Sequence, residues 1–277
     1  MTTVAYSPDI VAAAAPRGRG SLLSHSVFLT ARGVRALLRQ PAYAAITLIQ
    51  PIIWLLLFGQ LFRNIVHLPG FDTSGSYLEF ITPGVVVMTA LFSSAWAGTV
   101  FIEDMDRGVM DRMLASPVRR GAMIVGTLAY QSITTVIQTL IIFGVAFCSG
   151  ARFSGGVAGV LVTMLAACLI SVVFAAFSDA IALLVRQQEA LIGISQFIVL
   201  PLQFLSSAIM DTSLSPGWVQ TVARYNPVDW ATTAARAALS ADTDWGVVWP
   251  RLALLVGLAL LMAWVATRAF RVYQRSA

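Results

Sequence analysis

Six stretches of this chain are apolar over roughly the length of a bilayer-spanning helix, which needs about 20 mainly apolar residues. They cover residues 43–62, 80–102, 123–147, 157–185, 190–209 and 247–267. Hydrophobic residues make up 58% of the 277 and charged residues only 11%, whereas soluble domains carry about 25% charged residues. A soluble fold of this size could not bury so much apolar surface. We therefore predict an all-α membrane protein with six transmembrane helices.

The arginines predict how these helices are oriented. All 18 basic residues are arginine. If residue 1 lies in the cytosol, 13 arginines fall on the cytosolic side and five on the outer side, which satisfies the positive-inside rule. We therefore expect a multi-pass protein of the bacterial inner membrane with both termini in the cytosol. Because the arginines are scattered along membrane edges, the net charge of +5 does not indicate a nucleic-acid partner.

Two regions divide the chain in this interpretation. Residues 1–25 lack the basic and apolar segments of a signal peptide and are predicted to form a flexible cytosolic tail. Residues 26–277 are predicted to form a single transmembrane domain. The absence of lysine excludes the P-loop, whose lysine contacts nucleotide phosphates, so any ATP-driven step needs another chain. We expect no catalytic residues, cofactor or metal site in this chain, since no histidine–cysteine cluster has ligand spacing.

Residues 26–40 have the pattern of an amphipathic helix at the cytosolic interface. Arg32, Arg35 and Arg39 fall on one helical face, while apolar residues fall on another side. Pro41 ends this helix before the first span. Two interpretations remain open: simple anchoring by positive charge, or contact with a cytosolic partner.

The connection between the second and third spans, residues 103–120, is predicted to hold a short amphipathic helix. Ile102, Met105, Val109 and Met113 recur at helical spacing, and Glu103 precedes Arg107 by four residues, which favours an ion pair. Such a helix could place its methionines in a partner's groove. The alternative is a solvated, charge-balanced loop.

On the outer side, residues 211–246 are too patterned for a bare connector. One short helix is predicted around Trp218 and a second over residues 228–239, with Asn226 and Pro227 separating them. Tryptophans bracket the region, as expected at a membrane interface. We predict two short helices that dip into the outer leaflet, and the alternative is a surface cap without a transport role.

Several polar side chains fall at membrane depth, where polar groups face the interior of a bundle or a substrate route. The glutamines at these positions are Gln50, Gln131, Gln138, Gln196 and Gln203. They could form hydrogen bonds between helices or line a route for substrate. Asp179 lies seven residues before Arg186, and we expect it near the cytosolic interface, reached by water or paired with an arginine.

An ordered set of short motifs on this frame resembles a known family. The motifs are Arg39–Pro41, Gln50-Pro51, Thr82-Pro83-Gly84, the stretch from Glu103 to Arg120, Leu200-Pro201, Ser215–Trp218 and Tyr225-Asn226-Pro227. Over residues 27–270 the chain resembles the type-2 permeases of ATP-binding-cassette (ABC) exporters, and within them the daunorubicin-resistance type. The acidic residues Asp104, Asp106 and Asp111 depart from many relatives and leave the choice of ATPase open.

The resemblance implies partners and roles. Two permeases, identical or paralogous, would combine with separate P-loop ATPase subunits that hold ATP and magnesium. The helix over residues 103–116 would be the coupling helix on the ATPase, and the interface helix with Arg32, Arg35 and Arg39 would touch the same partner. The implied coupling residues are Glu103, Asp104, Arg107, Gly108, Met110, Met113, Leu114, Ser116 and Pro117. The outer pair of helices would be re-entrant, with Trp218, Asn226, Pro227 and Arg236.

Three functions are weighed on this basis. The resemblance implies export of an amphipathic drug-like molecule or lipid, with a link to antibiotic resistance. A secondary transporter or channel would need relays of acids within the membrane, for which only Asp179 is a candidate. A membrane enzyme would need a nucleophile or an acid–base pair, and no such motif stands out.

Overall fold

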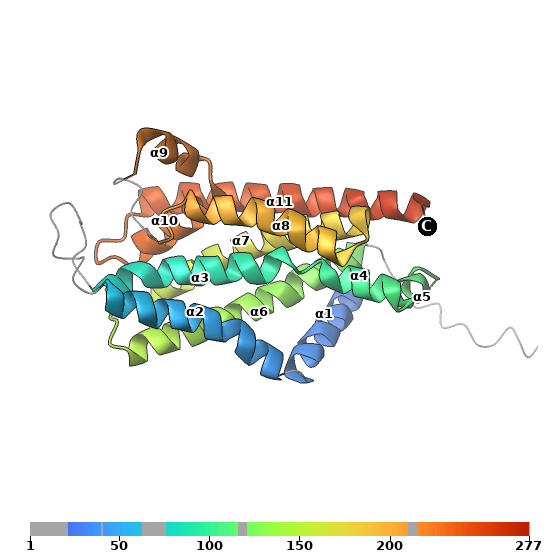
Figure 1. The fold of residues 1–277 in the computed structure, drawn as a ribbon, viewed down its shortest axis with the longest axis horizontal. Coiled ribbons are helices and arrows are strands. Elements are labelled where there is room, and N and C mark those ends of the chain that lie inside the picture. Colours follow the sequence, from blue (N-terminus) through green and yellow to red (C-terminus); the bar gives the residue numbers. More distant parts are fainter. Residues whose placement is uncertain (1–21, 40, 63–75, 116–120, 210–214, 277) are drawn as a thin grey trace, which may run out of the picture.

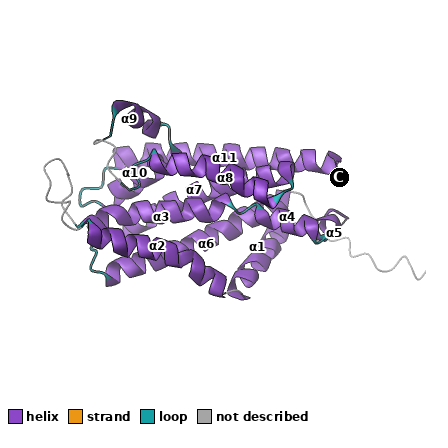
Figure 2. Cartoon of the chain, viewed as in Figure 1, coloured by secondary structure: helices purple, strands orange, loops and turns teal. Residues whose placement is uncertain are grey.

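The computed structural model describes residues 22–39, 41–62, 76–115, 121–209 and 215–276, and every regular element in these ranges is an α-helix (Figures 1 and 2). The helices are α1 (Leu22–Arg39), α2 (Pro41–Leu61), α3 (Tyr77–Ala95), α4 (Thr99–Asp106), α5 (Val109–Ala115), α6 (Gly121–Cys148), α7 (Gly156–Val185), α8 (Gln188–Phe204), α9 (Gly217–Arg224), α10 (Pro227–Leu239) and α11 (Trp245–Ser276). The predicted all-α class is confirmed for the described residues.

Four segments of the described chain are long and apolar enough to cross a membrane: Tyr77–Asp106, Gly121–Cys148, Gly156–Val185 and Trp245–Gln274. The apolar stretch Thr47–Leu61 in α2 is shorter, and α8 has 17 residues. The predicted third and fourth spans agree with α6 and α7 to within two residues at each end. The count of six spans stays a prediction.

Helix α7 lies at the centre of the bundle and packs against α3, α6, α10 and α11 (Figure 1). Small side chains make this central position possible, since alanines such as Ala166, Ala167 and Ala175 are fully buried and let neighbouring backbones approach closely. Helix α3 also contributes to the core, with Val86, Val87 and Leu91 almost fully buried. The bundle is therefore held by close packing of α11, α10, α3 and α6 around α7.

Glycines set the closest approach in this packing. A Cβ atom at Gly155 or at Gly159 would collide with the carbonyl oxygen of Ala238 in α10. The Gly155 N–H also donates a hydrogen bond to the Leu239 carbonyl (3.0 Å). This GxxxG pair therefore seats the start of α7 on α10 within the same chain.

The predicted second span, residues 80–102, is broken. Helix α3 ends at Ala95, and α4 begins at Thr99 after a bend. At the bend the Gly98 N–H donates to Ser178 Oγ (3.0 Å), and a side chain at Gly98 would collide with the Ser178 carbonyl. Contact with α7 thus fixes the position of the break.

Three other boundaries differ from the prediction. The interface helix begins at Leu22, inside the predicted tail of residues 1–25, and residues 1–21 lie outside the described chain. The helix of the predicted fifth span stops at Phe204 instead of residue 209, where the Leu205 N–H bonds back to Pro201. Helix α11 continues to Ser276, beyond the predicted end at residue 267.

The short helices gather at the two ends of the bundle. In Figure 1, α1, α4, α5 and the C-terminal end of α11 share one end, while α9 and α10 lie at the other. Which of these two ends faces the cytosol stays a prediction.

Candidate functional site

The predicted coupling helix is two helices instead of one. Helix α4 ends at Asp106, and α5 starts at Val109 after Arg107 and Gly108. Gly108 has φ +64°, a left-handed conformation that glycine adopts without the steric cost of a Cβ atom. The prediction of one helix over residues 103–116 is therefore wrong: α4 prolongs the second span and carries Glu103 and Asp104, while α5 alone forms the separate helix.

A bidentate ion pair between Arg32 and Asp104 joins α1 to α4. Arg32 Nη2 lies 2.6 Å from Asp104 Oδ1, and Nη1 lies 3.1 Å from Oδ2. The Asp104 side chain is 9% exposed and that of Arg32 is 46% exposed. Bidentate pairing of arginine with a carboxylate adds directional strength to the charge attraction. Asp104 therefore contacts the protein's own interface helix, and this use of the two residues differs from the separate partner contacts implied by the resemblance.

Met110 anchors α5 to the bundle. Its side chain is fully buried in a cluster that includes Phe101 of α4, Leu183 of α7 and Phe270 of α11. Of the predicted apolar stripe, Ile102 is buried, but Met105, Val109 and Met113 are only half-buried. The break at Gly108 rotates α5 relative to α4, so a stripe calculated for one helix selects the wrong methionines.

The exposed face of α4 and α5 is charged. Glu103 and Arg107 form the predicted ion pair (3.4 Å), and both are exposed. Asp111 and Arg112 of α5 are exposed as well. Leu114 lies in α5, while Ser116 and Pro117 lie outside the described residues. The described part of this surface carries charges of both signs around the half-buried Met105 and Met113.

Helix α1 packs on the protein's own third span instead of lying free at the interface. Gly33 faces the Tyr130 ring so closely that a Cβ atom would stand 2.7 Å from Tyr130 Cδ2. The Leu29 side chain faces Gly126 in the same way. Thr30 Oγ1 donates to the carbonyl of Ser26 (2.8 Å) and lies 3.3 Å from that of Gly126. The interface helix is thus part of the folded bundle.

At the opposite end, Asn226 connects α8 to α10. Its Nδ2 donates to the carbonyls of Leu202 (2.6 Å) and Leu205 (2.8 Å), while its Oδ1 accepts from the Val228 N–H (2.9 Å). One buried side chain thereby caps the end of α8 and the start of α10, where Pro227 occupies the first turn. Asp229 adds a bond from the Ser207 N–H (3.0 Å).

Arg236 of α10 reaches α3 and the segment after α8. Its Nε donates to the Phe80 carbonyl (3.2 Å), and its Nη2 donates to the Ala208 carbonyl (3.2 Å). The guanidinium also lies 3.8 Å from the centre of the Phe80 ring, within range of a cation–π interaction. Gly84 of α3 faces the Ala208 carbonyl with no room for a Cβ atom. These contacts make α10 the element that holds the start of α3 and the end of α8 together.

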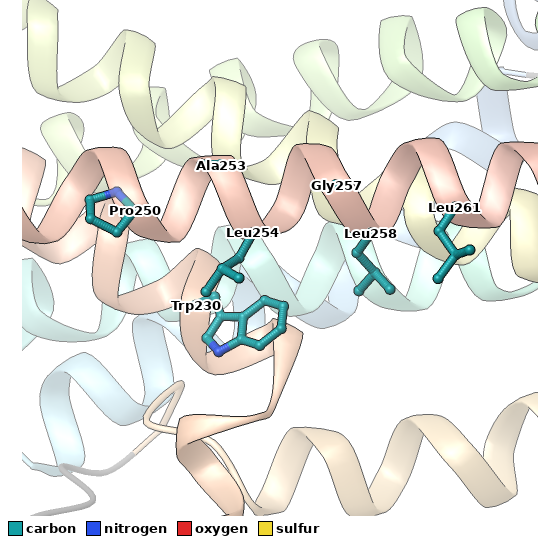
Figure 3. A pocket seen from close by; sticks show the side chains of 7 residues that line it. All are labelled: Trp230, Pro250, Ala253, Leu254, Gly257, Leu258 and Leu261. Carbon is teal, nitrogen blue, oxygen red and sulfur yellow. The ribbon is translucent and has the colours of Figure 1, made fainter.

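Trp218 of α9 is exposed, as expected for an interfacial tryptophan. Trp230 of α10 and the N-terminal half of α11, from Pro250 to Leu261, line a shallow apolar groove (Figure 3). Lipid acyl chains suit such a surface in a bilayer.

The glutamines at membrane depth occupy different environments. Gln131 is buried and donates to Ser93 Oγ of α3 (3.1 Å), as expected for a bond between helices. Gln138 and Gln203 are buried, each with its Oε1 unpaired among the described residues. Gln196 is half-buried, and Gln50 is exposed on α2.

Asp179 is neither reached by water nor paired with an arginine among the described residues, so that part of the expectation is wrong, while its depth in the membrane stays a prediction. The residue is fully buried, Thr127 Oγ1 donates to its Oδ2 (2.8 Å), and Oδ1 has no partner among the described residues. Arg186, expected nearby, follows the last residue of α7 in a left-handed conformation, and its guanidinium lies over the Tyr273 ring (4.6 Å).

Long apolar helices packed around α7, with short amphipathic helices at both ends, define a polytopic helical membrane protein. The chain belongs to the ABC-2 type transporter family, whose profile matches residues 26–240. It is 26% identical over 240 residues to the daunorubicin resistance ABC transporter permease protein DrrB1 of Streptomyces coeruleorubidus. This alignment covers 87% of this chain and 83% of that protein.

Other relatives carry related names. The putative transport permease ycf38 of Porphyra purpurea is 29% identical over 75% of this chain and 70% of its own length. The probable doxorubicin resistance ABC transporter permease protein DrrC of Mycobacterium tuberculosis is 23% identical over 68% of this chain and 67% of its own length. The resemblance inferred from the motifs is confirmed, and the chain is a transport permease.

Proposed function

We propose that the chain is the membrane-spanning subunit of an ATP-driven exporter that moves an amphipathic drug-like molecule or lipid outward. The observation that carries this proposal is the family match over residues 26–240, together with the drug-resistance names of relatives aligned over most of the chain. The chain has no lysine and therefore no P-loop, so a separate subunit would hydrolyse ATP with magnesium.

The proposed topology has six spans. Helix α2 and helix α8 would complete the four long segments, with both ends of the chain in the cytosol of a bacterium and α9 and α10 re-entrant from the outside. The positive-inside count of arginines and the grouping of the short helices at two ends support this arrangement.

In the proposed mechanism, the charged face of α4 and α5 rests on the ATPase. Met110 fixes α5 in the bundle, and the Arg32–Asp104 pair connects α4 to α1, so a force on α5 would reach both helices. ATP would favour one state of the complex to the extent that it binds that state more tightly than the other.

A second permease copy, or a paralogue, would cover the face formed by α2, α3 and α8. Phe197 and Phe204, seven residues apart on α8, are 82% and 66% exposed. Ile53 and Leu57 of α2 are exposed as well, and Gln50 and Gln196 lie on these two helices. An apolar face with occasional amides would suit both a dimer contact and a route for an amphipathic substrate. The buried Gln131, Gln138 and Gln203 would serve that route only after the helices move.

Gentle purification of the tagged chain from its native membrane tests this proposal first. A P-loop ATPase in stoichiometric amount is expected by mass spectrometry, and a second permease sequence in the sample would distinguish heterodimer from homodimer. Recovery of the chain alone, even after crosslinking, would contradict the proposal. The buried Asp179 favours a secondary transporter as the second candidate, which then predicts transport that survives ATP depletion and stops when the proton gradient collapses.

The double substitution Glu103→Ala with Met113→Ala tests the coupling surface. Glu103 is exposed and Met113 is half-buried on this face, so their loss should weaken ATPase retention and the efflux of a drug-like probe such as daunorubicin roughly tenfold, as for two contributing interface residues. The matched control, Asp242→Ala with Met262→Ala, removes an exposed acid and a half-buried methionine elsewhere. If the first variant keeps its ATPase and exports normally, the assignment of α4 and α5 is wrong.

A further inference from the structure

Helix α1 has three distinct faces. One face, with Leu29 and Gly33, packs on α6. A second carries large apolar side chains that no described residue covers: Leu23, Val27 and Leu38 are 73%, 66% and 72% exposed. The third carries the arginines. Because packing on α6 already uses one apolar face, the exposed apolar strip needs another explanation.

The arginine face forms a shallow hollow lined by Phe28, Arg32, Arg35, Ala36 and Arg39. Arg32 is held by Asp104 at its inner side. Arg35 and Arg39 are exposed and form no ion pair with any residue that the structure describes. Two cations that share a hollow repel each other, so an anion placed between them would be stabilised.

The hollow lies at the C-terminal end of α1, next to the start of α2. Arg39 is the last residue of α1, and α2 begins at Pro41. In Figure 1 this end of α1 meets α2 at the side of the bundle, away from α5. The arginines therefore lie beside the start of an apolar helix, at the depth expected for lipid headgroups in the proposed topology.

We propose that this hollow binds the phosphate group of an anionic phospholipid of the cytosolic leaflet, with Arg35 and Arg39 as the phosphate contacts. Arginine pairs with phosphate through two parallel hydrogen bonds. The strip of Leu23, Val27 and Leu38 runs beside the arginines and contacts the acyl chains. A soluble phosphate would make no use of that strip, so the combination of charge and apolar surface favours lipid.

The test uses the purified full-length chain in a neutral detergent, without any ATPase, so its outcome does not depend on the proposed function. The chain is mixed with dioleoyl phosphatidylglycerol or dioleoyl phosphatidylcholine, and native mass spectrometry measures how much of each lipid stays bound. The wild type is expected to retain phosphatidylglycerol preferentially. Arg35→Gln with Arg39→Gln should weaken that retention roughly tenfold, given the contribution of each cation near an anionic surface. Arg35→Lys with Arg39→Lys should keep most of it.

The matched control is Arg268→Gln with Arg271→Gln, which removes the same charge from the same end of the bundle. Equal loss in both double variants would assign the effect to general charge and overturn the site. Val27→Ser with Leu38→Ser should also lower retention. If it does not, and inorganic phosphate displaces the lipid, the site binds soluble phosphate instead. If Arg35→Gln with Arg39→Gln retains lipid like the wild type but loses the ATPase from the native complex, this face docks a protein and the lipid site is overturned.

Discussion

Arg32→Ala is expected to destabilise the chain by about 2–3 kcal/mol, because Asp104 would stay buried with its charge unpaired. The figure lies below that for a fully buried pair because the Arg32 side chain is 46% exposed. The variant should melt at a lower temperature in detergent, and the proposed export of a drug-like probe should fall because α1 no longer follows α4. Arg271→Ala, which removes an exposed arginine from α11, serves as the control and should melt like the wild type.

Reversing the pair separates its specific geometry from general charge. Arg32→Asp and Asp104→Arg should each be harmful, while the double variant should recover part of both stability and efflux, as expected for side chains in direct contact. If the double variant behaves as the sum of the single ones, the two residues do not interact in the protein as described.

Asn226→Ala is expected to have the largest effect at the outer end, about 3–4 kcal/mol, from a lost N-cap and two unpaired carbonyls. The melting temperature should fall, and protease should cleave more readily near the start of α10. Thr221→Ala is the control, since its hydroxyl is exposed and bonds only to Gly217 in its own helix.

Two further substitutions test which half of the Asn226 side chain matters. Asn226→Asp keeps an acceptor for the Val228 N–H but places negative oxygens against the carbonyls of Leu202 and Leu205. It should therefore be at least as harmful as alanine. If Asn226→Asp were neutral, the capping of α8 by this side chain would be refuted.

Apolar runs predict most of this fold, because the bilayer sets helix length and leaves few alternatives. The apolar run over residues 157–185 predicts the bounds of α7 to within a residue. The break at Gly108 was missed, although a glycine after a helical stretch is a common C-terminal signal.

Other features carry no local signal in the sequence. Arg32 and Asp104 are 72 residues apart, and no spacing rule relates them. The sequence predicts water access or an arginine partner for Asp179, yet the residue is fully buried and the nearby Arg186 lies over the Tyr273 ring instead. Asn226 was recognised as a helix breaker, but its bonds to α8 depend on packing that only three-dimensional structure reveals.

The bend at Gly98 divides the second span into arms of unequal length. Helix α3 has 19 residues and α4 has eight, so the arms measure about 28 Å and about 12 Å at 1.5 Å per residue. Gly98 is held against α7 at the bend, and the far end of the long arm carries Phe80, whose carbonyl accepts a hydrogen bond from Arg236. Because α3 is buried along most of its length, a displacement at α5 would be taken up by a change of the angle at Gly98 before it moved the far end of α3. The contacts of Arg236 in α10 with Phe80 would hold that far end in place while the short arm tilts.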